Sequence, residues 1–211
     1  MNWLGNLSPE KPLPHDLTWG HPPSKWAPLR GGGIRVFVPP KVDYFQDPAV
    51  TNTRDSAPYL HLDVIGDFVA RTHVRPAFTT TWDAGALMVR HTARRWAKLC
   101  FERTDLGTTA AVSVVTRGAS DDANGANLSA RDLHLQVLRV GDIFVMHYSL
   151  DGKRWLMVRL FSLAVPREVK VGLVAQCPAG PGTTVDFLSF SVESRTARDM
   201  RVRSLRDAAS L

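Results

Sequence analysis

Charged side chains interrupt an otherwise apolar stretch that runs from Trp82 to Glu102. The pattern is typical of a β-hairpin in which a short basic turn joins two strands, and its polar positions include Arg90, Lys98 and Glu102. A polar group inside a buried strand must be paired or must line a site, because burying it without a hydrogen bond costs free energy. Glu102 and Lys98 are therefore the candidate catalytic residues, a general acid–base pair tuned by burial.

A structural role is the alternative for this pair. Two residues four positions apart on one strand share a face but lie roughly 13 Å apart, given the rise per residue of a strand. Lys98 and Glu102 therefore cannot pair directly, and each would meet partners such as Arg90, Ser113 or Arg159 on neighbouring strands. Such a network could fix the register of the sheet or could bind a ligand, and the sequence leaves both interpretations open.

A second candidate face surrounds the dipeptide Asp151-Gly152. Asp-Gly favours a two-residue type I′ turn, in which both central residues have positive φ. This register pairs Tyr148 with Trp155 and places Arg159 on the same face, opposite the Ile, Val and Leu side chains expected in the core. Aromatic rings and a guanidinium suit a ligand-binding groove. Alternatively, Tyr148 and Trp155 form a cross-strand pair beneath the N-terminal segment.

The elements that must position these residues are β-strands. From Gly33 onward apolar and polar residues alternate, and Gly, Pro, Asp and Asn separate the runs, which is the pattern of an antiparallel sandwich or barrel. Residues 121–124 are expected to form an Asx-rich turn, which could alternatively offer oxygen ligands to calcium. The expected strands are 34–38, 60–64, 68–74, 86–91, 96–103, 111–117, 133–140, 143–149, 155–161, 169–176 and 185–193.

Two terminal segments flank the expected single domain. Residues 1–30, rich in Pro and Trp, are predicted to form an extended arm that packs on the sandwich, with an edge strand near Leu17–Trp19. Residues 31–194 are predicted to form the sandwich itself. Residues 195–211 carry apolar side chains at helical spacing and are predicted to form a short basic helical tail.

The composition limits the classes of partner. The 211 residues carry a net charge of +6, but the basic residues are scattered along the chain, which does not favour a nucleic-acid partner. No apolar run is long enough for a membrane span and no secretory signal is recognised, so a cytoplasmic protein is expected. The seven His residues lie apart and no phosphate-binding loop is present, so neither a metal nor a cofactor is expected.

Several short motifs occur in an order that is similar to that of a known family. From about Leu17 to Val192, the sequence resembles the concanavalin A-like domain family of unknown function typified by the regulation-of-enolase protein. The resemblance implies an all-β, two-sheet antiparallel jelly-roll sandwich of the lectin and glucanase type. The motifs include Val42-Asp43-Tyr44-Phe45, Gly66-Asp67-Phe68, Trp96-Ala97-Lys98-Leu99-Cys100-Phe101-Glu102 and Trp155-Leu156-Met157-Val158-Arg159. The residues that match the family's polar pattern are Asp43, Lys98, Glu102, Ser113 and Arg159.

Together these observations predict a sandwich that binds a small polar ligand, with a carbohydrate as the leading candidate, on its concave sheet. An alternative is an enzyme, a hydrolase, lyase or isomerase, that acts on a sugar or secondary metabolite at the same face. A glycosidase of the ordinary kind is disfavoured, because no strand carries its paired carboxylates. A third hypothesis is a protein partner bound by the N-terminal arm. The predicted ligand-binding residues are Asp43, Arg90, Trp96, Lys98, Glu102, Ser113, Tyr148, Trp155 and Arg159.

Overall fold

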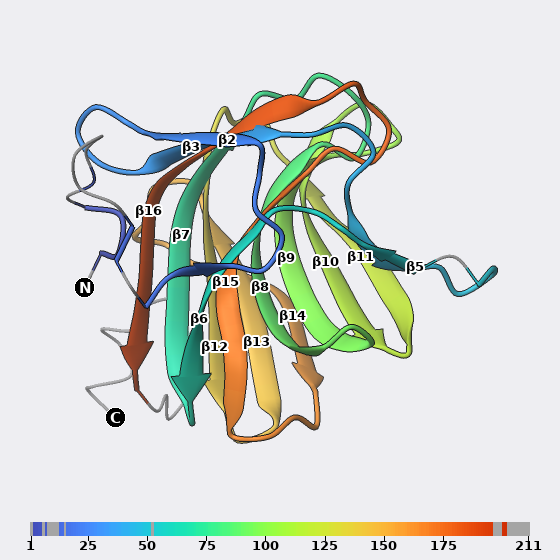
Figure 1. The fold of residues 1–211 in the computed structure, drawn as a ribbon. Helices are drawn as coiled ribbons and strands as arrows, with labels where there is room; N and C mark the ends of the chain where they lie inside the picture. The colour runs from blue at the N-terminus through green and yellow to red at the C-terminus, as the bar shows by residue number, and fades with distance from the viewer. Residues whose placement is uncertain are drawn as a thin grey trace.

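The computed structural model is a β-sandwich in which two antiparallel sheets of seven strands pack face to face (Figure 1). The structure describes residues 2–5, 7, 13–14, 16–51, 53–195 and 200–201. The first sheet has the strand order β1-β6-β15-β8-β9-β10-β11, and the second has the order β14-β13-β12-β7-β16-β3-β2. A two-stranded hairpin, β4–β5, belongs to neither sheet.

The strand bounds follow from the alternating runs of the sequence. The first sheet comprises β1 (Thr18–Trp19), β6 (Tyr59–Ile65), β8 (Ala84–Thr92), β9 (Arg95–Arg103), β10 (Thr109–Arg117), β11 (Ala119–Asn127) and β15 (Glu168–Gln176). The second comprises β2 (Lys25–Pro28), β3 (Ile34–Val38), β7 (Phe68–Pro76), β12 (Leu133–Val140), β13 (Ile143–Ser149), β14 (Leu156–Ser162) and β16 (Thr183–Ser194). The separate hairpin comprises β4 (Tyr44–Gln46) and β5 (Thr53–Asp55).

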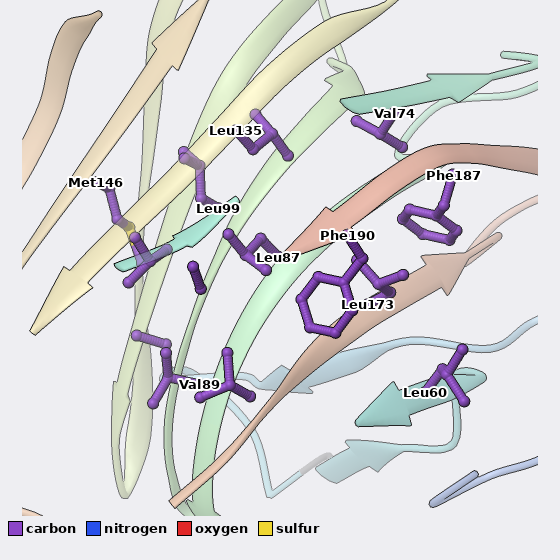
Figure 2. Packing of buried hydrophobic residues seen from close by; sticks show 14 of the residues in the cluster. Leu60, Val74, Leu87, Val89, Leu99, Leu135, Met146, Leu173, Phe187 and Phe190 are labelled. Carbon is purple, nitrogen blue, oxygen red and sulfur yellow. The ribbon is translucent and has the colours of Figure 1, made fainter. Parts of the chain in front are cut away.

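Alternation along each strand separates a core face from an outer face. In β9, Leu99 and Phe101 lie in the core between the sheets, whereas Trp96 and Cys100 belong to a second cluster on the outer face of the first sheet. Figure 2 shows leucine, valine and phenylalanine side chains of both sheets meeting in the core. Lys98 and Glu102 share the parity of Trp96 and Cys100, so the fold directs them to the outer face.

The N-terminal segment packs on the sandwich where it is described. β1 pairs with β6 at the edge of the first sheet, where an edge strand was expected, and β2 pairs with β3 at the edge of the second sheet. Trp3, Trp19 and Trp26 are partly buried against the core cluster. These indole rings therefore cover apolar surface of the same chain.

The predicted fold is wrong in one feature, the short C-terminal helix. Strand β16 extends the second sheet to Ser194, Arg195 has no regular structure, and Met200 and Arg201 form a turn. None of the described tail residues is helical, and the rest of the segment 195–211 lies outside the described residues. Over the ranges that the structure describes, no helix has the length and apolarity needed to cross a membrane.

A second difference concerns residues 119–127, of which 121–124 were expected to form a turn. They form β11, the edge strand that pairs with β10 from Ala110 to Arg117. Most of its side chains are exposed, which is why the run contains Asp, Asn and Gly instead of alternating apolar residues. A polar edge strand does not show the alternation by which central strands are recognised.

Gly172 provides a test of strand packing in the centre of the first sheet. A methyl group at this position would lie 2.1 Å from the carbonyl oxygen of Leu60 and 2.6 Å from the Cα atom of His61, both on β6. Because backbone cannot move aside as a flexible side chain can, we expect Gly172→Ala to lower the free energy of unfolding by about 3 kcal/mol. Urea denaturation measures the loss. Gly20→Ala, whose added methyl would make ordinary contacts of 3.4 Å or more, is the control; equal stability of both variants would contradict the argument.

Candidate functional site

A pocket of about 300 Å³ opens on the outer face of the first sheet. Its floor comes from β9, β10 and β15, and residues at and around the β4–β5 hairpin line another side. Four acidic residues line it together with two basic and two aromatic ones. The acidic residues are Asp43, Asp47, Glu102 and Asp122, the basic residues are Arg54 and Lys98, and the aromatic residues are Phe45 and Trp82.

The hairpin β4–β5 is fixed over the sheet by both apolar and polar contacts. Tyr44 is buried in the outer cluster, where its ring and the Trp96 ring meet edge to face at a centroid distance of 6.3 Å. The backbone N–H of Gln46 donates to the hydroxyl of Ser120 on β11 over 2.9 Å. The pocket wall is therefore anchored to the sheet, and Asp43 is held at the entrance of the hairpin.

Lys98 connects this wall to the floor. Its ammonium donates to Oδ1 of Asp43 over 3.1 Å, to the carbonyl oxygen of Tyr44 over 2.8 Å and to Oε1 of Gln176 over 2.7 Å. The side chain is only 2% exposed. An ammonium group has three protons, so these three acceptors use its full capacity.

This pairing keeps Lys98 charged. Burial alone would lower the pKa of Lys98, but the negative charge of Asp43, together with Cys100 and Glu102, raises it above its ordinary value. A lysine of this kind does not act as a base at neutral pH. Its role in the geometry is to hold the segment around Asp43 and Tyr44 against Gln176.

Glu102 is the least compensated group in the pocket. The side chain is 6% exposed, and its one hydrogen bond among the described residues is from Nε2 of Gln176 to Oε2 over 3.4 Å. Burial raises the pKa of Glu102 to about 8; Lys98 acts against the rise, whereas Asp122 and Asp43 add to it. Glu102 therefore holds a proton at neutral pH and can donate a hydrogen bond into the pocket.

Trp82 lines the rim in a strained conformation. Its φ is 65°, in the left-handed region that non-glycine residues rarely adopt, and the residue is 47% exposed. Its N–H donates to the carbonyl oxygen of Arg103 over 2.7 Å, and Gln176 Nε2 donates to its carbonyl oxygen over 3.2 Å. Next to it, buried Asp83 accepts hydrogen bonds from Thr79 and Thr80 that fix the turn. Strain of this kind persists only where surrounding contacts maintain it, and it concentrates at functional sites.

The comparisons with known proteins agree with this fold. Residues 19–195 match the family described as "Protein of unknown function (DUF1349)". The chain belongs to this family. Over 178 residues it is 29% identical to regulation of enolase protein 1 of Saccharomyces cerevisiae, an alignment that covers 83% of this chain and 88% of the yeast protein.

Solved structures place the DUF1349 chain among jelly-roll sandwiches. A functionally unknown protein from Saccharomyces cerevisiae has a TM-score of 0.79 at 27% identity, over 86% of this chain and 97% of the other. The GH43 protein BlXynB of Bacillus licheniformis has a TM-score of 0.66 at 16% identity, over 85% of this chain and 37% of that longer one. The carbohydrate-binding module CBM66 of Bacillus subtilis has a TM-score of 0.55 at 16% identity, over 85% and 96%. The last two likenesses concern the fold alone.

The structure brings three of the predicted site residues of this DUF1349 protein into the pocket: Asp43, Lys98 and Glu102. Arg90 shares their face but is held elsewhere, because its guanidinium donates two hydrogen bonds of 2.6 Å to Asp55. Trp96 is fully buried beneath Tyr44, with its indole N–H bonded to the carbonyl oxygen of Ala93. Both therefore support the pocket wall and do not line it.

The predicted register of the hairpin β13–β14 is wrong. Tyr148 pairs with Leu156 and Met146 with Arg159, with a bulge between, so the strands are shifted from the pairing that a two-residue turn would impose. The carboxylate of Asp151 accepts hydrogen bonds from the N–H groups of Lys153 and Arg154, which closes a wider Asx turn.

Four predicted ligand-binding residues lie away from the pocket. Tyr148 belongs to the core between the sheets, and Ser113 faces the same core because it pairs with Leu99. Trp155 is buried on the second sheet beneath the guanidinium of Arg71, 5.7 Å from the ring centroid. Arg159 pairs with Asp121 over 2.9 Å, which ties the edge strands of the two sheets together.

Several pocket residues were not singled out from the sequence. Trp82 precedes an expected strand and Gln176 ends one, and Phe45 belongs to a motif of which only Asp43 was taken as a site residue. Asp122 was considered only as a calcium ligand in a turn, and Asp47 lies where no site was expected. The sequence feature that could have pointed to this part of the site was an aromatic residue followed directly by an acidic one, Trp82-Asp83. It gives no indication of the positive φ of Trp82.

Proposed function

We propose that this DUF1349 protein binds a small hydroxylated ligand, a sugar or a sugar-like polyol, in the pocket between β9 and the β4–β5 hairpin. The observation that carries the proposal is the strained, half-exposed Trp82 at the rim of a cavity that contains the buried acid Glu102. Tryptophan offers a flat apolar surface for a sugar ring, while carboxyl and amide groups bind hydroxyls.

The size and lining of the pocket support a ligand of about one or two sugar rings. A volume of about 300 Å³ is at the lower end of the range for small-molecule sites. Trp82 and Phe45 supply aromatic surface, and Glu102 and Asp122 supply polar groups from β9 and β11. The likeness of the fold to a carbohydrate-binding module and to a glycoside hydrolase is consistent with this ligand class, but the side chains of the pocket carry the proposal.

Replacing Trp82 separates binding from stability. We expect Trp82→Gly to weaken the binding of a sugar at least ten-fold, because stacking is lost, and to change the free energy of unfolding by less than about 1 kcal/mol. Relief of the positive φ offsets the lost contacts of a half-exposed side chain. Calorimetric titration with a sugar found by thermal shift measures the first effect, and urea denaturation measures the second. Trp82→Phe keeps an aromatic ring and should retain part of the affinity; unchanged affinity in Trp82→Gly would refute the stacking role.

The neutral carboxyl group of Glu102 supports a second candidate function for the same pocket, in which the protein is an enzyme that acts on the bound sugar. A neutral carboxylic acid at pH 7 can protonate a leaving group or a carbonyl oxygen, as general acids do. Lys98 would serve only to position the pocket wall, since its three protons are already bonded. This function requires that the wild type converts a bound sugar, detected by NMR of the mixture, and that Glu102→Gln binds the sugar without converting it.

A further inference from the structure

The charge of the pocket differs in sign from that of the chain. The chain as a whole carries +6, yet the pocket is lined by four acidic and two basic side chains. A net positive protein would favour an anionic ligand on overall charge alone. The charge that a ligand in the pocket must carry is set by the pocket's own side chains instead, because they lie closer to the ligand than the charges on the rest of the surface, which are screened by salt.

Both basic side chains are already bonded to the protein. Lys98 donates to three acceptors, and Nη1 of Arg54 donates to the carbonyl oxygen of Pro178 over 3.4 Å. Lys98 also neutralises Asp43, the one pocket carboxylate with which it forms an ion pair. Arg54 keeps free N–H donors, but it is exposed at the outer side of the pocket, so the buried floor around Glu102 offers a phosphate or carboxylate ligand no uncommitted ammonium group.

Three acidic side chains remain without a cation. Asp47, Glu102 and Asp122 form no ion pair within the ranges that the structure describes. Among the same residues, no three acidic, His or Cys side chains converge closely enough to hold a metal ion. Carboxyl groups that are spread over a cavity wall suit a monovalent cationic group on a larger ligand, since an ammonium needs only one or two of them.

We propose that the ligand carries a primary ammonium group beside its hydroxyls, as an amino sugar does, and that this group binds against the buried carboxyl of Glu102. The inference rests on the proposed function, because it names the class of sugar for the same pocket. Glu102 is the deepest of the three uncompensated acids, whereas Asp47 and Asp122 are more exposed. A neutral sugar would leave Glu102 as a simple hydrogen-bond donor, but an ammonium would ionise it.

Proton release follows from this geometry. The charged groups around Glu102 are Lys98 on its own strand, Asp122 on β11, Asp43 before β4 and Asp105 after β9, and the thiol of Cys100 lies between Lys98 and Glu102. Because burial holds the pKa of Glu102 at about 8, the carboxyl group of Glu102 is protonated at pH 7 when no ligand is bound. An arriving ammonium lowers that pKa, so binding at pH 7 should release up to one proton per ligand.

The test is calorimetric titration of the full chain at pH 7 with glucosamine, galactosamine and mannosamine. Each is compared with its neutral parent sugar and its N-acetyl derivative, in two buffers of different ionisation enthalpy. We expect one amino sugar to bind at least ten-fold more tightly than its two neutral counterparts and to release a proton. In Glu102→Gln both the preference and the proton release should disappear, whereas Glu168→Gln, at an exposed position of β15, should keep both.

Each other outcome has a separate meaning. Equal or tighter binding of the neutral sugars would overturn the ammonium site and leave the proposed sugar-binding function intact. An amino-sugar preference that persists in Glu102→Gln would overturn the assignment to Glu102. Absence of binding by all nine sugars would count against both the ammonium site and the sugar-binding function.

Discussion

Lys98→Met is expected to destabilise the protein by about 3–5 kcal/mol, the range for removing one partner of a buried ion pair. Methionine fills a similar volume but leaves the carboxylate of Asp43, the carbonyl oxygen of Tyr44 and Oε1 of Gln176 without their shared donor. Each of these groups would then be buried without compensation. The midpoint of urea denaturation, at unchanged slope, measures the loss.

Lys170→Met is the matched control for this prediction. Lys170 also pairs with an aspartate, Asp63, over 2.8 Å, but both side chains are about half exposed. A surface pair contributes less than about 1 kcal/mol, so this variant should unfold close to the wild type. If Lys98→Met is no less stable than Lys170→Met, the buried network around Lys98 does not stabilise the fold.

Strands at the centre of a sheet could be predicted from the sequence because both their faces constrain residue type. The bounds of β12 and β13 match the predicted ranges 133–140 and 143–149, and β9 differs from its range by one residue. A two-sheet jelly roll also followed from the resemblance to the family. The edge strand β11 was missed because polar side chains on an exposed strand show no alternation. The hairpin β4–β5 was missed because each of its strands has three residues, too few to show a period.

The orientation of the β13–β14 hairpin could not be read from residue types alone. Apolar side chains occur on both of its faces: Phe144 and Met146 fill the core, while Val145 and Leu160 pack in a small cluster outside. Alternation shows which residues of β13 share a face, but it does not show which of two apolar faces packs against the other sheet. The bulge changes only the pairing of β14 with β13. The sequence contains the Asp-Gly signal for the short turn, but the hydrogen bonds of Asp151 to Lys153 and Arg154 override it.

Two pocket residues could be predicted because they are charged, whereas the other buried positions of the same strand are apolar. Lys98 and Glu102 occupy positions where β9 otherwise carries buried apolar residues, and this conflict identified them. Trp82 violates a rule of backbone conformation instead, and a φ of 65° leaves no mark in residue types. Side chains that complete a site from loops, such as Asp47, become visible only once the chain is folded.

The second large effect is expected in the pH dependence of stability of Glu102→Gln. The carboxyl of Glu102 has a pKa of about 8 in the folded protein, against an ordinary value of 4.5, because burial disfavours the charged form. Between these values the unfolded chain releases the proton and the folded chain retains it. The free energy of unfolding therefore falls as pH rises through this window, by about 1.4 kcal/mol per pH unit from this one group.

Glutamine has no proton to release, so Glu102→Gln should escape this loss. Near pH 4 the two proteins should differ little, and by pH 8 the variant should be more stable than the wild type by on the order of 4 kcal/mol. Urea denaturation of both proteins at pH 4, 6 and 8 measures the difference between their free energies of unfolding. Titrating groups that behave alike in the two proteins do not contribute to this difference. Glu168→Gln removes one exposed carboxylate from the same sheet and controls for net charge.

The sign of the effect is what makes the measurement decisive. A glutamate stabilised by an ion pair would have a lowered pKa, and its replacement would cost more stability as pH rises. A buried glutamate held neutral gives the opposite slope, with the variant gaining on the wild type between pH 4.5 and 8. Parallel curves, or a variant that loses stability toward pH 8, would mean that Glu102 is ionised at neutral pH, and the pocket would then contain a fixed carboxylate in place of an acid.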